Sequence, residues 1–283
     1  MKNRRWLYLA LIAVCLAAFY GYRAVARLST DTKAPEINVG TETLQVSVQD
    51  SRAVLLQGVT ATDNSDGDVT SSLVVESVRL VDSNGTVSVS YAAFDKAGNV
   101  AKAERQVQYT DYESPRFSLS VPLVFAQNSS FDVLSVIEAE DMVDGSITHR
   151  IRATSLDSNS IITLGTHDVE FRVTNSQGDT AELVLPVEVY SSGSYQAQLS
   201  LTSYLIYLNV GDSFRAEDYL GEYTLGREVT SLRGGVPSGF ILRTTGEVDT
   251  QTPGVYTVAY KVSTSQAEQL YTGYSKLIVV VEG

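Results

Sequence analysis

Cysteine is almost absent from this sequence of 283 residues. The single cysteine, Cys15, lies in an apolar stretch near the N-terminus, so the rest of the chain carries none. Disulfides, cysteine metal sites and a cysteine nucleophile are therefore excluded there. Hydrophobic residues make up 43% and charged residues 19%, which is a globular composition. Because no disulfide can form, we expect domains that are stabilised by their cores alone.

Histidine and the common catalytic motifs are also scarce. Only two histidines occur, His149 and His167, and we interpret both as partly exposed residues in or beside strands. The sequence contains no Gly-x-Ser-x-Gly nucleophile elbow, no P-loop, no GxGxxG turn and no HExxH zinc motif. We therefore expect that the protein is not an enzyme.

Basic residues are outnumbered by acidic ones, and the formal net charge is −12. Because five of the basic residues precede residue 28, the remainder of the chain is still more acidic. Such a surface repels nucleic acid, so we expect no nucleic-acid partner. An acidic surface is compatible with binding a cation or a basic partner, and it is equally compatible with a role in solubility alone.

Residues 6–22 are an uncharged apolar run, with Lys2, Arg4 and Arg5 before it and Arg23 after it. Such a run is at the short end for a spanning helix, and aromatic residues stand at both of its ends, as they do at membrane interfaces. We therefore predict a transmembrane signal-anchor within residues 1–28. The positive N-terminus predicts a single-pass protein of a bacterial cell membrane whose C-terminal domains are extracytoplasmic.

Two alternatives remain for this segment. Ala24, Val25 and Ala26 have the small-x-small pattern that signal peptidase accepts, and cleavage near Ala26 would release a secreted protein. Lipidation of Cys15 is disfavoured, because Val14 does not suit the position before a lipidated cysteine. Each interpretation places the rest of the chain outside the cytoplasm.

Beyond residue 32 the sequence repeats with a period of about 80 residues. The landmarks that recur at this offset are Pro35 with Pro115, Gly85 with Gly165, Val89 with Val169, and Gly98 with Gly178. A third, more distant copy keeps mainly the strand at residues 253–260. We expect short linkers at residues 110–114 and 191–195. The domains they join are predicted at residues 33–111, 113–190 and 196–283.

Each repeat is typical of short, half-buried β-strands. Valine alternates with serine at residues 87–90, which is the period of two that a strand requires. Turns such as Asp66-Gly67 and Asn84-Gly85 separate the strands. We predict an all-β fold of three tandem Ig-like β-sandwich domains in a rod. The lack of a Cys–Trp–Cys core excludes an antibody-type domain.

Residues 33–37, 61–70 and 91–99 resemble the bacterial Ig-like domain, a module of surface adhesins and pesticidal crystal proteins that is similar to the HYR module. The shared pattern is an aPxI opening, an A-x-Dnx-DGdiT middle and a Y-x-a-x-D-x-aGN closing. The second repeat keeps part of it, and the third keeps little. The resemblance implies a β-sandwich with an adhesive, spacer or accessory role, and it implies no substrate.

One acidic loop is a candidate metal site. Asp63, Asp66 and Asp68 supply three carboxylates within six residues, and we expect Asp95 and Asn99 to approach them across the sandwich. Ca²⁺ binds six to eight oxygens in such loops. The alternative interpretation is that these side chains only shape turns by accepting bonds from their own backbone. In that case the protein has no cofactor.

Tyrosine is abundant, with 16 residues, and many of them lie in the third repeat. Aromatic clusters on a surface bind sugars or anchor protein partners. The candidate ligand-binding patch, distal to the membrane, consists of Tyr219, Tyr223, Tyr271 and Tyr274. On alternating strands tyrosines also serve as packing residues, and this alternative stays open.

These features predict a non-enzymatic, membrane-anchored extracellular protein that mediates adhesion or binds a protein or glycan at the bacterial cell surface. A structural spacer or accessory subunit of a cell-envelope complex, without a ligand of its own, is the alternative. An exposed aromatic patch on the third repeat favours binding, and uniformly polar faces favour the spacer. The sequence predicts no oligomeric state.

Overall fold

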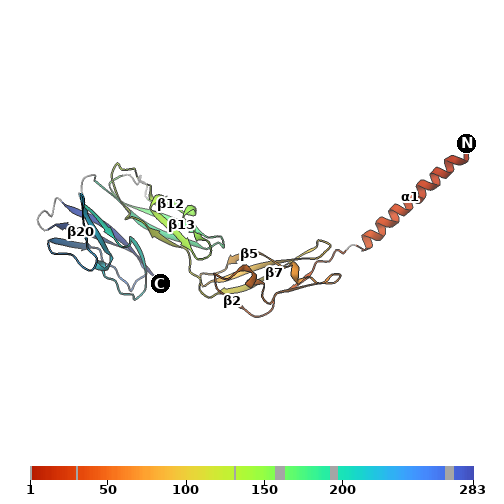
Figure 1. The fold of residues 1–283 in the computed structure, drawn as a ribbon, viewed down its shortest axis with the longest axis horizontal. Helices are drawn as coiled ribbons and strands as arrows, with labels where there is room; N and C mark the ends of the chain where they lie inside the picture. Colours follow the sequence, from red (N-terminus) through yellow and green to blue (C-terminus); the bar gives the residue numbers. More distant parts are fainter. Residues whose placement is uncertain (1, 30, 131, 157–162, 192–196, 265–270) are drawn as a thin grey trace. The chain divides into compact units, whose positions relative to one another are not determined.

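The structure is a computed structural model that describes residues 2–29, 31–130, 132–156, 163–191, 197–264 and 271–283 (Figure 1). It begins with the helix α1 (Lys2–Ser29). Within this helix the side chains of residues 2–5, 7, 9 and 24–29 lie outside the description. The linker expected at residues 191–195 also lies mostly outside the described residues.

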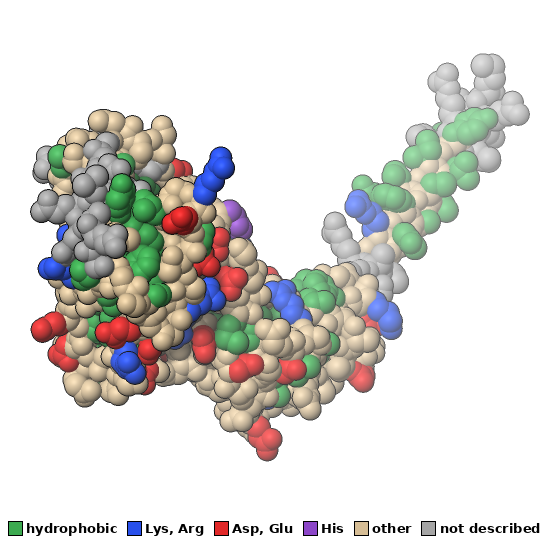
Figure 2. All heavy atoms as spheres, turned by 60° about the vertical axis from the view of Figure 1, so that its left-hand side comes forward, with side chains coloured by type: hydrophobic (Ala, Val, Ile, Leu, Met, Phe, Trp, Pro, Cys, Tyr) green, Lys and Arg blue, Asp and Glu red, His purple; other side chains and the backbone are tan. Residues whose placement is uncertain are grey.

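The side chains of α1 that Figure 2 draws in colour are mostly hydrophobic. Within the described part of the chain, no helix combines the length and the apolar character needed to cross a membrane. The transmembrane segment expected at residues 6–22 is therefore not confirmed.

Beyond α1, the described residues form strands and short 3-10 helices joined by turns and loops. The chain divides into two compact units. The first unit is Met1–Asp111 and the second is Tyr112–Gly283, so the second and third repeats belong together. An all-β fold made of sandwich-like sheets is confirmed apart from α1, whereas three separate domains are not. The 3-10 helices are η1 (Arg52–Leu56), η2 (Thr70–Ser72), η3 (Val133–Ser135), η4 (Thr148–Arg150) and η5 (Ala216–Tyr219).

The first repeat is a sandwich of two sheets. One sheet contains, in spatial order, β1 (Glu36–Asn38), β3 (Thr60–Asp63) and β4 (Gly67–Asp68). The other contains β2 (Leu44–Val46), β7 (Val100–Tyr109), β6 (Thr86–Phe94) and β5 (Val74–Leu80). β2 runs parallel to β7, and the other neighbours are antiparallel. Alternation along β6 buries Val87, Val89 and Tyr91, as the valine–serine pattern predicts.

The second repeat has the same strand order. Its three-stranded sheet contains β11 (Gly145–Ser146), β10 (Ile137–Asp141) and β8 (Arg116–Leu119). Its four-stranded sheet contains β12 (Arg152–Ser155), β13 (Gly165–Thr174), β14 (Thr180–Tyr190) and β9 (Val124–Ala126). β9 runs parallel to β14, as β2 does to β7. The period of about 80 residues thus corresponds to a repeated seven-stranded, Ig-like sandwich.

Among its described residues the third repeat also has seven strands, but they form one connected sheet. Six of them follow the order β18 (Glu228–Ser231), β17 (Leu220–Leu225), β15 (Ala197–Leu201), β21 (Thr272–Glu282), β20 (Gly254–Thr264) and β19 (Phe240–Thr245). The seventh, β16 (Leu205–Asn209), pairs in parallel with the last part of β21, and β15 pairs in parallel with its first part. The sheet is continuous because β15 and β16 share β21 as a neighbour.

A shared hydrophobic core joins the second and third repeats. Leu205 of β16 and Ile278 and Val280 of β21 belong to the same buried cluster as Phe117 and Leu185 of the second repeat. The third repeat therefore contributes strands to the core of the second. Burial of apolar surface is the main favourable term in protein association, so this contact explains why the two repeats form one unit.

Strand β21 is buried on both of its faces. Ile278 and Val280 face the second repeat, while the alternate residues Leu277, Val279 and Val281 belong to the core of the third repeat. A strand buried on both faces needs a continuous apolar run instead of alternation. The unbroken run at residues 277–281 is the sequence signal for this arrangement.

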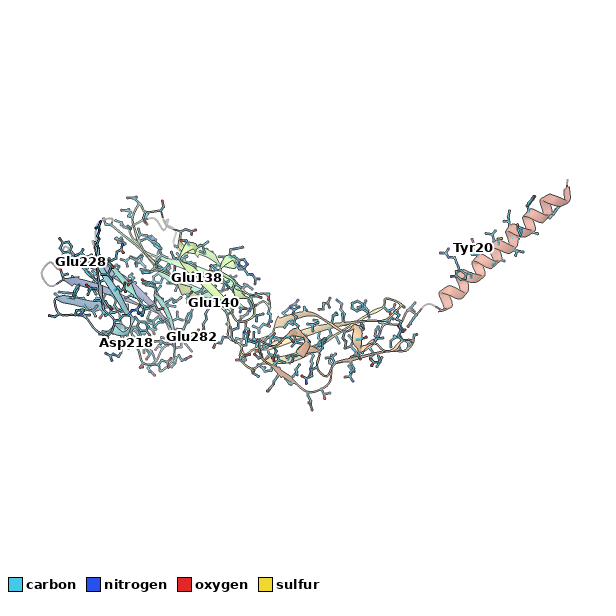
Figure 3. All side chains as sticks on the ribbon, in the orientation of Figure 1. Tyr20, Glu138, Glu140, Asp218, Glu228 and Glu282 are labelled. Carbon is cyan, nitrogen blue, oxygen red and sulfur yellow. The ribbon has the colours of Figure 1, made fainter. Side chains whose placement is uncertain are left out.

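Polar contacts accompany the shared core. Arg116 of β8 forms an ion pair at 2.8 Å with Glu282, which Figure 3 labels, and its guanidinium lies 5.0 Å from the ring centroid of Tyr207. The hydroxyl oxygen of Tyr207 accepts a hydrogen bond from the backbone N–H of Phe117 at 3.1 Å. Because the Arg116–Glu282 pair is largely exposed, it contributes little compared with the apolar core.

Candidate metal centre

Three carboxylates converge at one end of the first sandwich. Asp63 is the last residue of β3, Asp95 directly follows β6, and Asp31 lies between α1 and β1. Because β3 and β6 belong to different sheets, Asp63 and Asp95 approach each other across the sandwich. One carboxylate oxygen from each of the three residues lies within 4.8 Å of the others.

Asp63 is held by the turn that follows it. Its Oδ1 accepts hydrogen bonds from the backbone N–H groups of Asp66 and Ser65, at 2.9 and 2.7 Å. These two N–H groups lower the pKa of the Asp63 carboxyl, so it is ionised at neutral pH. Its other oxygen, Oδ2, is buried and has no hydrogen-bond partner.

Asn99 links Asp95 to the segment that precedes β1. Its side-chain amide donates to Oδ2 of Asp95 at 2.7 Å and lies 3.2 and 3.3 Å from the backbone carbonyls of Asp31 and Lys33. Its backbone N–H donates to Oδ1 of Asp95 at 2.7 Å. Asn99 thereby positions Asp31 beside the other two carboxylates. Oδ2 of Asp31, like that of Asp63, is buried without a hydrogen-bond partner.

Two of the residues expected to bind Ca²⁺ have other partners. Asp66 accepts the backbone N–H of Lys96 at 2.7 Å and pairs with the ammonium of the same residue at 3.0 Å. Asp68 accepts the backbone N–H of Thr70 at 2.9 Å. These contacts are the turn-shaping role that the alternative interpretation assigned. In the structure, Asp31 takes the place expected for Asp66 and Asp68.

Asp31 was missed because the first domain was expected to begin at residue 33. A signal was present in the repeat pattern, since Asp31 precedes Pro35 by four residues and Asp111 precedes Pro115 by the same number. Asp111 itself has a different role, because its carboxylate accepts a hydrogen bond from the hydroxyl of Ser47 at 2.6 Å.

The second repeat has the same loop frame with different chemistry. Asp141, the last residue of β10, accepts two backbone N–H groups of the following turn at 2.9 and 2.8 Å, as Asp63 does in the first repeat. Its Oδ2, however, accepts a hydrogen bond from the side-chain amide of Asn175 at 3.0 Å. Asn175 follows β13 at the position that Asp95 occupies after β6.

Tyr112 completes this second network. The Asn175 amide also donates to the hydroxyl of Tyr112 at 3.2 Å, and that hydroxyl donates to Oδ2 of Asp179 at 2.5 Å. Burial and the Asp179 carboxylate raise the pKa of the Tyr112 hydroxyl, so it remains a donor. In the second repeat the Asn175 amide thus satisfies the carboxylate oxygen of Asp141 that corresponds to the unpaired Oδ2 of Asp63.

The histidines lie elsewhere in the second repeat. His149 is exposed on η4. His167 is 5% exposed in β13, and its Nε2 lies 2.8 Å from the backbone oxygen of Thr163. The expectation of partial exposure is therefore wrong for His167, because it shares the inward face of β13 with Val169 and Phe171.

Two of the four tyrosines expected to form a distal patch, Tyr219 and Tyr223, are packing residues, and Tyr271 is partly buried. Tyr223 is buried, and its hydroxyl donates to the backbone carbonyl of Tyr271 at 2.7 Å. Tyr219 is partly buried against the core of the third repeat. Tyr274 donates its hydroxyl to Glu188 of β14 at 2.9 Å. These placements differ from an exposed patch, because Tyr223 of β17 faces the core of the third repeat and Tyr219, at the end of η5, packs against it, while Tyr274 of β21 contacts the second repeat.

A cavity of about 340 Å³ lies at the junction of the second and third repeats. Tyr274 is the one member of the expected patch that lines it. The lining residues are Pro122, Val124, Tyr190, Ala197, Gln198, Leu199 and Tyr274. Beside it, the Glu188 carboxylate contacts both the Tyr274 hydroxyl and the Lys276 ammonium. The junction therefore combines aromatic rings with hydrogen-bonding and charged groups.

Comparison with known proteins does not place the chain in a family. No family model matches it. An uncharacterized 81.3 kDa protein of Acholeplasma phage L2 is 30% identical over 123 residues, which are 39% of this chain and 16% of the phage protein. The matched part of this chain therefore spans less than a fifth of the length of that relative.

Two solved structures resemble parts of the chain. Drosophila N-cadherin EC1-3 is 12% identical, with coverage of 86% of this chain and 98% of that one and a TM-score of 0.30. The CBM51-2 and INT domains of Clostridium perfringens ZmpB, in complex with GlcNAc, are 18% identical, with coverage of 59% and 31% and a TM-score of 0.23. The Ig-like architecture of this chain is assigned from its own strand order and register.

Proposed function

We propose that the protein is a non-enzymatic, membrane-anchored, extracytoplasmic protein that binds a protein or glycan at the bacterial cell surface. The cavity at the junction of the second and third repeats carries this proposal. Residues of both repeats form it, and their shared core holds the two sides together. Its volume lies within the range of ligand pockets, which begins at about 300 Å³.

The lining of the cavity suits a glycan. Tyr190 and Tyr274 offer aromatic rings, whose faces pack against the C–H groups of sugars. Gln198 carries both a hydrogen-bond donor and an acceptor for sugar hydroxyls. Convergent polar groups among apolar and aromatic side chains are typical of pockets that bind small ligands.

Glycan-array binding of the full-length protein, followed by calorimetry with the glycans that bind, tests this function. Gln198→Ala and Tyr190→Ala are expected to weaken binding at least tenfold, because each removes a lining group. Gln251→Ala is the matched control, since Gln251 is exposed in the turn between β19 and β20. Equal binding by Gln198→Ala and the control, or no saturable binding to any glycan, contradicts glycan recognition at the junction.

A structural spacer without a ligand of its own is the second candidate. The burial of Tyr223 and the packing of Tyr219 favour it, because they remove the exposed aromatic patch expected of a binding end. A spacer acts through its length and stiffness alone. Replacing residues 112–283 by an unrelated two-sandwich protein of similar size therefore preserves the function of a spacer and abolishes that of a binding protein.

Membrane anchoring is supported by the apolar run at residues 6–22 and its basic flanks. Alkaline carbonate extraction of membranes from the bacterium that makes the protein tests it. An anchored protein stays in the pellet with an intact N-terminus. A soluble protein whose mature N-terminus follows Ala26 indicates cleavage and secretion instead.

A further inference from the structure

We propose that Asp31, Asp63 and Asp95 bind one Ca²⁺ ion at the end of the first sandwich, and that this ion fastens the segment preceding β1 to the sandwich. The inference is independent of any ligand at the junction cavity, because the three residues belong to the first unit.

The unpaired oxygens point to an ion. Asp63 is 8% exposed, and its Oδ2 is buried without a partner beside the Asp31 and Asp95 carboxylates. Oδ2 of Asp31 is likewise buried and has no hydrogen-bond partner. Buried polar atoms in native proteins are nearly always paired, and a buried carboxylate oxygen needs a donor or a cation. None of the ion pairs among the described residues supplies a cation to Asp31, Asp63 or Asp95.

The spacing of the three oxygens fits a single calcium ion. Ca²⁺ binds oxygen at about 2.3–2.6 Å, so two of its ligands lie at most about 5 Å apart. The carboxylate oxygens of Asp31, Asp63 and Asp95 lie within 4.8 Å of one another, inside that limit. An all-carboxylate set favours a hard cation such as Ca²⁺ over zinc or copper, which prefer nitrogen and sulfur ligands.

The second repeat supplies a comparison within the same chain. Its loop frame is the same, but the amide of Asn175 replaces the carboxylate of Asp95 and donates to Asp141 at 3.0 Å. The oxygen of Asp141 that corresponds to the unpaired one of Asp63 is thus satisfied without an ion. The two repeats represent two ways of closing the same end of a sandwich, one with an ion and one with hydrogen bonds.

The position of Asp31 gives the ion a structural consequence. Asp31 precedes β1 and is joined to the sandwich by its backbone contact with the Asn99 amide. An ion shared by Asp31, Asp63 and Asp95 adds a second, stronger attachment for the same segment. Removal of Ca²⁺ is therefore expected to free the backbone around Lys33 and to expose it to protease.

Calorimetric titration of the full-length protein with CaCl₂, after treatment with EDTA, tests the site. We expect one Ca²⁺ per chain and a rise in the melting temperature of the first unit. Asp31→Asn and Asp63→Asn are expected to weaken Ca²⁺ binding at least tenfold. Asp82→Asn is the matched control, because Asp82 is an exposed turn carboxylate that accepts hydrogen bonds from the nearby backbone N–H groups of Asn84 and Thr86. Its Ca²⁺ affinity is expected to equal that of the unmodified protein.

Trypsin cleavage after Lys33, followed by mass spectrometry, gives a second readout. Ca²⁺ is expected to lower the rate of this cleavage in the unmodified protein and in Asp82→Asn. In Asp31→Asn the rate is expected to be the same with and without Ca²⁺. The proposal is overturned by an absence of heat and of any melting shift at millimolar Ca²⁺. It is equally overturned if the Asp31→Asn and Asp63→Asn variants, while folded, bind Ca²⁺ as tightly as the control.

Discussion

The side-chain amide of Asn175 donates to Oδ2 of Asp141 across 3.0 Å, at the place where the first repeat sets the carboxylate of Asp95 beside that of Asp63. An amide nitrogen donates two hydrogen bonds, whereas an ionised carboxylate only accepts them. The exchange of one residue type at this position therefore decides whether the loops can close by hydrogen bonds. The backbone frame around both positions is the same.

Asn175→Asp is expected to destabilise the second unit at neutral pH. The change removes the two donated hydrogen bonds of the Asn175 amide and places a second carboxylate against Asp141. Leaving buried acceptors unpaired costs roughly 1–3 kcal/mol, so we expect a loss of about 2 kcal/mol or more. Urea denaturation followed by circular dichroism measures it.

Added Ca²⁺ provides a second test of the Asn175→Asp variant. If the frame of the second repeat is equivalent to that of the first, millimolar Ca²⁺ recovers part of the stability that Asn175→Asp loses. Asn84→Asp, at an exposed turn position, is expected to be nearly neutral and indifferent to Ca²⁺. A variant as stable as the unmodified protein in EDTA contradicts the interpretation of the second network.

Leu205→Ala is expected to destabilise the second and third repeats together. Leu205 is 6% exposed in the core that the two repeats share, and such truncations cost about 2–5 kcal/mol. Differential scanning calorimetry is expected to show two transitions for the whole protein, with only the transition of the second unit shifted. Val229→Ala, at a position 58% exposed, serves as the control and is expected to change little. Three separate transitions would show that the repeats unfold independently.

Tyr207 is expected to make the second unit sensitive to alkaline pH. Burial raises the pKa of the Tyr207 hydroxyl to about 12, although the Phe117 N–H that it accepts acts in the opposite direction. A folded-state pKa above the unfolded value of about 10 means that the protonated hydroxyl contributes its full stability below pH 10. This contribution is lost as the pH rises from about 10 through 12.

The Tyr207→Phe variant isolates this effect from the titration of other tyrosines. Two pKa units correspond to roughly 2–3 kcal/mol, and the variant is expected to lack that part of the alkaline decline. Urea denaturation between pH 8 and about 11.5 measures the difference. Parallel declines for the variant and the unmodified protein would rule out Tyr207 as the source.

Gly246→Ala is expected to be far more harmful than Gly211→Ala. Both glycines have positive φ angles, of +102° and +92°, so alanine is strained at either position. At Gly246 a Cβ would also lie 2.1 Å from the backbone oxygen of Thr257, whereas at Gly211 it meets nothing within 4 Å. We expect about 1 kcal/mol from strain alone at Gly211 and several times that at Gly246. Equal urea midpoints for the two variants would contradict this steric explanation.

The candidate site was predictable only in part. Asp63 and Asp95 stand next to turns that the sequence predicts, so their approach across the sandwich followed from the pattern of strands. The pattern of strands did not predict which of the neighbouring carboxylates lie beside Asp63 and Asp95. The Asp66 carboxylate accepts a hydrogen bond from Lys96, whereas Oδ2 of Asp31 is buried without a partner. Both facts depend on contacts between segments that are far apart in the sequence.

The sequence by itself determined the repeated seven-stranded sandwiches, because strand alternation and glycine turns are local patterns with a period that can be counted. It also contained the apolar run at residues 277–281, which requires two buried faces. Only the tertiary structure decided that the second face is covered by the core around Phe117. An apolar strand indicates that it must be buried, but its partner is set by shape and packing between residues far apart in the chain.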